Sequence, residues 1–185
     1  MCVVIDAQLV GGGGQLGGPL PILYRIPSQK THQLMHILIL GSTGQTGQEI
    51  CRALIRQGQP PVAAARNLHK ARQLFGERAT YRFFDFQQPD SYPATLQGID
   101  RIFAFAPPNS EDPEPMRYLL QAMEQANVQR LVFQSGRATG DVPGSLLYQI
   151  EQLLAESPIP TTIIRPGWLM QNFLSWAGTT LSDKQ

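Results

Sequence analysis

Three glycines stand at regular spacing between a short apolar run and a longer amphipathic one. They are Gly41, Gly44 and Gly47, in the segment Gly-Ser-Thr-Gly-Gln-Thr-Gly. Glycines so placed allow a tight turn, close approach of a phosphate to bare backbone, and close packing of a helix on a strand. The helix that follows would offer unpaired N–H groups and the positive end of its dipole to a pyrophosphate. The segment predicts a dinucleotide-binding loop, with an ordinary glycine-rich turn as the alternative.

The remaining residues of this segment refine the prediction. Ser42, Thr43 and Thr46 are expected to add hydroxyl donors to the loop. The Gly-Lys-Ser/Thr ending of a P-loop is absent, which argues against that class of phosphate site. The context of a strand before and a helix after the loop is the one that a dinucleotide motif requires.

Arg66 ends the next apolar run, where the choice between two cofactors is usually made. An NAD site commonly has Asp or Glu about 20 residues after the glycines, bound to the ribose hydroxyls. Here the run ends in Arg66, and no acidic residue follows before Glu77. A planar guanidinium pairs well with a 2′-phosphate. We therefore expect NADP to be preferred over NAD, with a merely exposed arginine as the alternative.

Two further strand ends carry candidate residues. Asp85 lies at the end of the third predicted strand, near the expected adenine position, where a carboxylate can accept a hydrogen bond from the exocyclic amine. A solvated aspartate at a strand end is an equally good interpretation. Ala106 and Pro107 close the fourth predicted strand, where the nicotinamide ribose would pass.

Alternating apolar and amphipathic segments supply the elements that must position these residues. Strands are predicted over 36–40, 61–66, 80–86, 100–106, 129–135 and 161–165, and helices over 45–57, 68–75, 91–96, 115–126 and 144–156. Strands separated by helices require right-handed crossovers, which give a parallel sheet with helices on both faces. The expected fold class is α/β, a Rossmann-type doubly wound sheet of order 3-2-1-4-5-6.

The chain of 185 residues suits one such domain. Residues 1–34 are rich in Gly and Pro and are predicted to be a disordered extension. Residues 35–185 are predicted to be the NAD(P)-binding domain.

Composition narrows the classes of partner. The formal net charge of +1 gives no reason to expect binding to nucleic acid or to an anionic membrane. No apolar stretch reaches the roughly 20 residues that cross a bilayer. Cys2 and Cys51 lack metal-ligand spacing, so no metal site is expected. Sparse cysteines fit a reducing compartment, and we expect a cytoplasmic protein.

Three stretches of the chain resemble a known family. They are the Gly41–Gly47 loop, the strand end Phe133-Gln134-Ser135, and the run 151–173, which includes Arg165-Pro166-Gly167-Trp168. Together they resemble the NmrA-like branch of the atypical short-chain dehydrogenase/reductase family, which includes NAD(P)H-dependent quinone and azo-dye reductases. The resemblance covers Met35 to about Leu174.

The resemblance implies both a site and a function. It implies a dinucleotide site made of Gly41, Thr43, Gly44, Gln45, Thr46, Gly47, Arg66, Asp85, Ala106, Pro107 and Ser135. It also implies that Arg165, Pro166 and Asn172 lie beside the cofactor and substrate cleft. Many members reduce quinones or related electrophiles, whereas others bind the cofactor as redox-sensing regulators. A small-molecule substrate, a regulated protein partner and a homo-oligomer are all compatible with this branch.

Two departures from the family pattern bear on catalysis. The Tyr-x-x-x-Lys pair of short-chain dehydrogenases is incomplete, because Gln152 stands four residues after Tyr148. Leu147 also stands where this branch often has Lys or His, four residues before Glu151. Tyr148 is therefore interpreted as an ordinary helix residue rather than a catalytic acid. Family members also run well past the position of Gln185, so most of the substrate lobe is expected to be missing, and a fragment inactive by itself is a third interpretation.

Overall fold

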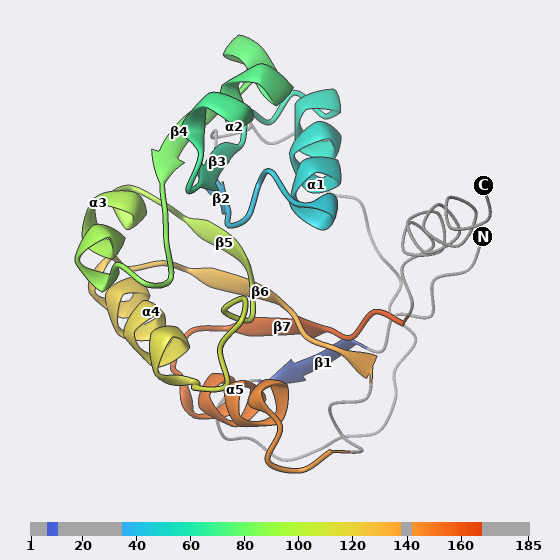
Figure 1. Cartoon of the computed structure of the whole chain (residues 1–185), viewed down its shortest axis with the longest axis vertical. Coiled ribbons are helices and arrows are strands. Elements are labelled where there is room, and N and C mark those ends of the chain that lie inside the picture. Colours follow the sequence, from blue (N-terminus) through green and yellow to red (C-terminus); the bar gives the residue numbers. More distant parts are fainter. Residues whose placement is uncertain (1–6, 11–34, 138–141, 168–185) are drawn as a thin grey trace, which may run out of the picture.

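A single sheet organises the computed structural model, which describes residues 7–10, 35–137 and 142–167 (Figure 1). The strands within these ranges are β1 (Ala7–Val10), β2 (Ile37–Ile39), β3 (Val62–Ala65), β4 (Thr80–Phe83), β5 (Arg101–Phe105), β6 (Arg130–Gln134) and β7 (Thr161–Ile164). Their order across the sheet is β1-β7-β6-β5-β2-β3-β4. Strands β2 to β7 are parallel to their neighbours, and β1 alone is antiparallel. The predicted parallel sheet of order 3-2-1-4-5-6 is confirmed.

Helices cover both faces of the sheet (Figure 1). They are α1 (Gln45–Arg56), α2 (Leu68–Phe75), α3 (Tyr92–Leu96), α4 (Glu114–Gln125) and α5 (Leu146–Glu156). Helices α1 and α2 pack on one face, and α3, α4 and α5 pack on the other, each group over its own apolar core. No helix in the described part of the chain has the length and apolar character that crossing a membrane requires.

Strand β2 and the residue that follows it form a continuous apolar run because both faces of the sheet are covered here. Leu38 and Leu40 belong to the core under α3–α5, whereas Ile39 belongs to the core under α1 and α2. All three side chains are at most 1% exposed. Successive side chains of a strand point to opposite faces, so a strand covered on both sides must be apolar throughout. Burial of this strand fixes the position of the glycine loop that follows it.

Strand β4 ends earlier than the sequence predicts. It stops at Phe83 rather than at residue 86. Beyond it, Phe84 stacks on Tyr92 of α3 with ring centroids 5.1 Å apart, and Phe86 meets Phe84 edge-on at 4.9 Å. These aromatic contacts draw the segment away from the sheet and toward α3. The local apolar pattern does not distinguish this packing from continued strand.

Strand β1 lies inside the segment predicted to be disordered. It pairs with β7, with Ala7 opposite Ile164 and Val10 opposite Thr161. The structure differs from the prediction at these four residues, and the rest of 1–34 lies outside the described residues. A strand whose hydrogen-bond partners are near the other end of the chain leaves little signal in its local composition.

Candidate functional site

The predicted site residues lie at the end of the sheet where the parallel strands have their carboxyl ends. Strand β2 lies between β3 and β5. Strands β3 and β4 follow on one side of it and β5, β6 and β7 on the other, so the strand order reverses at β2. In open α/β sheets, ligands bind outside the carboxyl ends of the strands where the order reverses. The glycine loop after β2 and Ala106-Pro107 after β5 meet there. The tertiary structure therefore brings these two predicted parts of the site together.

Gly41 and Gly47 have no room for a side chain. Gly41 has φ +61°, and a Cβ built on it would lie 2.4 Å from Cε1 of Phe105. A Cβ on Gly47 would lie 2.3 Å from the carbonyl oxygen of Gly41. This oxygen belongs to the backbone, so it cannot move without displacing the loop. Gly41 therefore makes the turn, and Gly47 lets α1 pack directly on the loop. These are the two roles that the motif predicts for the first and third glycines.

The N-terminus of α1 is open to an anion. Its N-cap is Gly44, which provides no side-chain cap, and no acidic residue occupies the first turn. The N–H of Gln48 donates to the carbonyl of Gly44 at 2.9 Å, so the N–H groups of Gln45, Thr46 and Gly47 precede this bond. Gly44 and Gln45 are exposed. Uncapped N–H groups and the helix dipole fit a pyrophosphate here.

The hydroxyl residues of the loop have different roles. Ser42 is fully buried, and both its N–H and its hydroxyl donate to the carbonyl of Ala64, at 3.1 and 3.0 Å. The prediction that Ser42 supplies a phosphate donor is wrong, because its proton is used to fasten the loop to β3. Thr43 and Thr46 are partly exposed beside the open helix end. They remain predicted cofactor contacts.

Arg66 and Asp85 follow neighbouring strands. Arg66 is exposed directly after β3, and within the described residues no hydrogen bond or ion pair engages its guanidinium. Its guanidinium is therefore accessible to a negatively charged group of a ligand. Asp85 is half-buried, and its Oδ1 accepts the N–H of Gln87 at 3.1 Å. Part of its carboxylate therefore closes a local turn, and its predicted contact with adenine stays a prediction.

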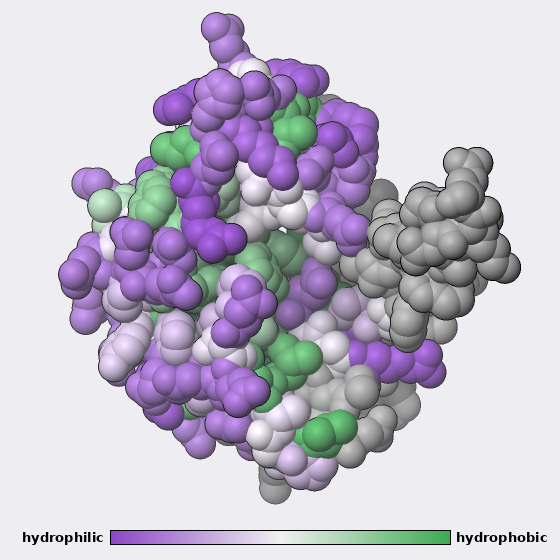
Figure 2. Space-filling model, viewed as in Figure 1, coloured by the Kyte–Doolittle hydropathy of each residue, from purple (hydrophilic) through white to green (hydrophobic). Residues whose placement is uncertain are grey.

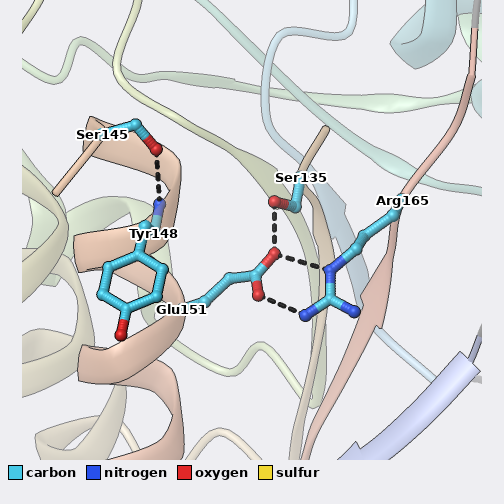
Figure 3. Close-up of polar contacts among 5 residues, drawn as sticks. All are labelled: Ser135, Ser145, Tyr148, Glu151 and Arg165. Carbon is cyan, nitrogen blue, oxygen red and sulfur yellow. Dashed lines mark hydrogen bonds and ion pairs between the residues drawn. The ribbon is translucent and has the colours of Figure 1, made fainter. Parts of the chain in front are cut away.

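A polar cluster joins the ends of β6 and β7 to α5 (Figure 3). The hydroxyl of Ser135 donates to Oε1 of Glu151 at 2.5 Å. Arg165 donates through Nε to Oε1 at 3.0 Å and through Nη2 to Oε2 at 2.5 Å. Ser135 is 6% exposed and Glu151 is 8% exposed. The cluster holds together α5 and the ends of β6 and β7, beside the predicted dinucleotide site.

The charge state of Glu151 follows from these contacts. Burial raises the pKa of this carboxyl, but hydrogen bonds from Arg165 and Ser135, together with the positive charge of Arg165, outweigh it and leave the pKa lowered. Glu151 is therefore ionised at neutral pH. Glu151 is not among the predicted site residues, although an acidic residue between the buried Ile150 and Leu154 of α5 is a usable signal.

Tyr148 does not join this cluster. Its backbone N–H donates to the hydroxyl oxygen of Ser145 at 3.3 Å, which caps the N-terminus of α5. Its ring extends from the side of α5 away from Glu151 and Ser135 (Figure 3). This placement agrees with the interpretation of Tyr148 as an ordinary helix residue.

The remaining predicted positions differ in how far they are buried. Ala106 is half-buried, Pro107 is buried, Pro166 is half-buried next to Arg165, and Asn172 lies outside the described residues. Figure 2 shows hydrophilic residues around the rim of the viewed face, with apolar residues recessed between the half carrying α1 and α2 and the half carrying α4 and α5. The described residues contain no group of three or more His, Cys, Asp or Glu side chains that could hold a metal ion.

Comparisons with known proteins agree with this geometry. The sequence profile of a family described as NAD(P)H-binding matches residues 41–180. An NAD(P)H azoreductase from Xenophilus azovorans is 32% identical over 145 residues, which are 76% of this chain and 51% of the azoreductase. The prestalk A differentiation protein A of Dictyostelium discoideum is 31% identical over 149 residues, which are 77% of this chain and 48% of that protein.

A solved structure shares the fold. It is the NADPH complex of an NADPH-dependent quinone oxidoreductase from Escherichia coli, with a TM-score of 0.69 and 26% identity. The similarity covers 80% of this chain and 54% of that one. The chain spans about half the length of the curated relatives it matches.

Proposed function

This chain belongs to the NAD(P)H-binding family, and from that premise we propose that it forms the cofactor domain of an NADPH-dependent reductase of quinone-like or other small electrophiles. We place it in the NmrA-like branch of the atypical short-chain dehydrogenases. The observation that carries the proposal is the uncapped N-terminus of α1, set by Gly41 and Gly47 at the point where the strand order reverses. The azoreductase and quinone oxidoreductase relatives support the type of reaction.

The described residues would bind the cofactor by complementary charge and shape. The N–H groups of Gln45, Thr46 and Gly47 would bind the pyrophosphate, and Arg66 the 2′-phosphate. Ala106 and Pro107 would border the nicotinamide half. The cofactor supplies the hydride when bound, and the protein supplies position and electrostatics.

Reduction by hydride transfer also needs a proton, and the Ser135–Glu151–Arg165 cluster is not suited to supply it. Glu151 is ionised, so it has no proton to give, and the Ser135 hydroxyl points its proton at Glu151. Tyr148 points elsewhere (Figure 3). Reduction of a quinone by hydride leaves a resonance-stabilised anion, which solvent can protonate. The cluster therefore suits an electrophile that needs no acid from the protein.

The placement of Tyr148 also favours a second function, a non-catalytic NADP(H)-binding sensor that regulates a protein partner. A sensor needs the glycine loop and Arg66 but no catalytic acid. For either function we propose a cytoplasmic location, a small-molecule substrate or a regulated partner, and self-association, with no nucleic acid or membrane partner. The near-neutral charge supports the proposed lack of nucleic-acid and membrane partners, and the sparse cysteines support the proposed location.

Oxidation of NADPH, followed by its absorbance with a panel of quinones, separates the two functions. The reductase is expected to consume NADPH at a rate that rises with both protein and quinone concentration. Binding of NADPH without oxidation of any quinone would support the sensor. If NADPH does not bind at all, both functions are wrong for this chain.

Replacement of Arg66 by Ala is expected to remove the preference for NADPH. Hydrogen bonds to a charged group contribute about 1.5–3 kcal/mol, so the ratio of NADH to NADPH dissociation constants should fall about 10- to 100-fold. Arg101→Ala is a matched control, because Arg101 is an exposed arginine at the opposite end of a strand. Titration calorimetry with both cofactors measures the ratio. A ratio that is unchanged in Arg66→Ala would contradict the proposed preference.

A further inference from the structure

Gln48 connects α1 back to the glycine loop. Its Nε2 donates to the carbonyl oxygen of Thr43 at 2.8 Å, and its Oε1 accepts from Nη2 of Arg52 at 3.2 Å. A guanidinium only donates and a carbonyl only accepts, so one orientation of the Gln48 amide satisfies both partners. Arg52 is itself held through Nη1 by Glu49 at 2.5 Å. The side chain of Gln48 therefore reaches the loop in a defined orientation.

The peptide between Thr43 and Gly44 is held at both of its polar ends. The Thr43 carbonyl accepts from Gln48, and the Gly44 N–H donates to the carbonyl of Gly41 at 2.9 Å. Glycine permits backbone rotations that other residues resist, so a peptide next to Gly44 rotates at low cost unless something holds it. A rotated peptide would turn the Thr43 carbonyl dipole toward the expected pyrophosphate. Negative character there would oppose an anion.

We propose that Gln48 is a positioning residue for the dinucleotide. By holding the Thr43 carbonyl against α1, it keeps the loop in the conformation that leaves the helix N-terminus open to the pyrophosphate. Gln48 acts through Thr43 and is not assigned a contact with the cofactor. The inference rests on the proposed function only in that the site binds a nicotinamide dinucleotide phosphate.

Two variants test this role through NADP⁺ affinity. Gln48→Met keeps the length of the side chain and removes the donor. Loss of one neutral hydrogen bond should weaken NADP⁺ binding about 5- to 10-fold. Gln121→Met is the matched control on α4, because Gln121 is exposed and distant from the loop, and it should bind as the wild type does. Titration calorimetry gives the dissociation constants, and thermal unfolding shows that each variant is folded.

Gln48→Glu adds a pH-dependent test, for which the uncharged Gln48→Met variant is the comparison that separates a lost donor from an added charge. An ionised carboxylate cannot donate to the Thr43 carbonyl, but a protonated carboxyl can. The ratio of variant to wild-type dissociation constants should therefore be high at neutral pH and fall toward one between about pH 6 and pH 4. For Gln48→Met the same ratio should stay constant. Taking the ratio cancels the titration of the 2′-phosphate, which both proteins share.

The outcomes separate this inference from the proposed function. Wild-type affinity in Gln48→Met would overturn it, because only the added charge of Gln48→Glu would then matter. A Gln48→Glu ratio that does not fall on acidification would overturn it as well. If the wild-type chain binds no NADP⁺, the proposed function fails and the inference fails with it.

Discussion

Replacement of Glu151 by Leu is expected to lower the free energy of unfolding by about 1.5–3 kcal/mol, the range for losing hydrogen bonds to a charged group. The change leaves the Arg165 guanidinium, whose side chain is 28% exposed, without this carboxylate. It also removes the acceptor of the Ser135 hydroxyl. Urea unfolding followed by circular dichroism measures the loss.

Two further variants identify the cause of that loss. Glu151→Leu combined with Arg165→Met removes both charges and should recover a large part of the stability, because apolar pairs often replace buried ion pairs at no cost. Glu114→Ala breaks an exposed ion pair with Arg117 and should have little effect. The interpretation is wrong if Glu151→Leu and Glu114→Ala are equally mild.

The contribution of Glu151 should also depend on pH. Its pKa is lowered in the folded chain, so the stabilisation is present above the ordinary carboxyl pKa and is lost as the pH falls through the folded value. The difference in stability between wild type and Glu151→Gln should be constant from about pH 8 to pH 5 and shrink below that. A difference that grows on acidification would contradict a lowered pKa.

Replacement of Gly47 by Ala is expected to cost about 3 kcal/mol of stability, at the upper end of the range for overpacking, and to abolish detectable NADPH binding. The added Cβ would lie 2.3 Å from the Gly41 carbonyl oxygen and 2.9 Å from Cα of Ser42. Both atoms are backbone, so relief requires α1 to move away from the loop. Alanine favours a helix more than glycine does, so the net loss of stability is a lower limit on the cost of the clash.

Gly98→Ala serves as the comparison for this glycine. Gly98 has φ +68°, and a Cβ there would meet nothing within 4 Å. Its cost should be the backbone strain alone, about 1–2 kcal/mol, with NADPH binding unchanged. Chemical unfolding and calorimetric titration of both variants make the comparison. Retention of NADPH binding by Gly47→Ala would show that the loop tolerates displacement of α1.

Much of the fold could be predicted because its signals are local. Buried runs such as 37–39 and 62–65 must be apolar on both faces, and that requirement is visible in the sequence. A glycine with positive φ, another local signal, follows α1 and α2, with φ +72° at Gly58 and +59° at Gly76. Strand β1 and the early end of β4 were not predictable in this way. Strand β1 depends on β7, which lies far away in the sequence. The early end of β4 depends on the stacking of Phe84 on Tyr92, which is near in sequence but comes into contact only because α3 packs on that face of the sheet.

The candidate site also has a part that the sequence predicts and a part that it does not. Spacing alone identified Gly41, Gly44 and Gly47, because a close backbone approach excludes every side chain larger than hydrogen. The direction in which each polar side chain points was not predictable. Ser42 turns inward to Ala64, and Gln48 reaches back to Thr43. A hydroxyl or an amide has several possible partners, and only the packed chain selects one.

The sequence by itself determined the parallel α/β sheet, the dinucleotide loop and the place of Arg66 at the end of β3, because these depend on residue type and spacing along the chain. The tertiary structure alone decided that Glu151 is ionised between Ser135 and Arg165, and that Tyr148 points away from them. Ser135 and Arg165 directly follow β6 and β7, and Glu151 lies on α5. Their side chains interact only because the folded sheet brings them within hydrogen-bonding distance. The Gly41–Gly47 loop can therefore be predicted from the sequence, whereas the charge state of Glu151 depends on the contacts that the fold creates.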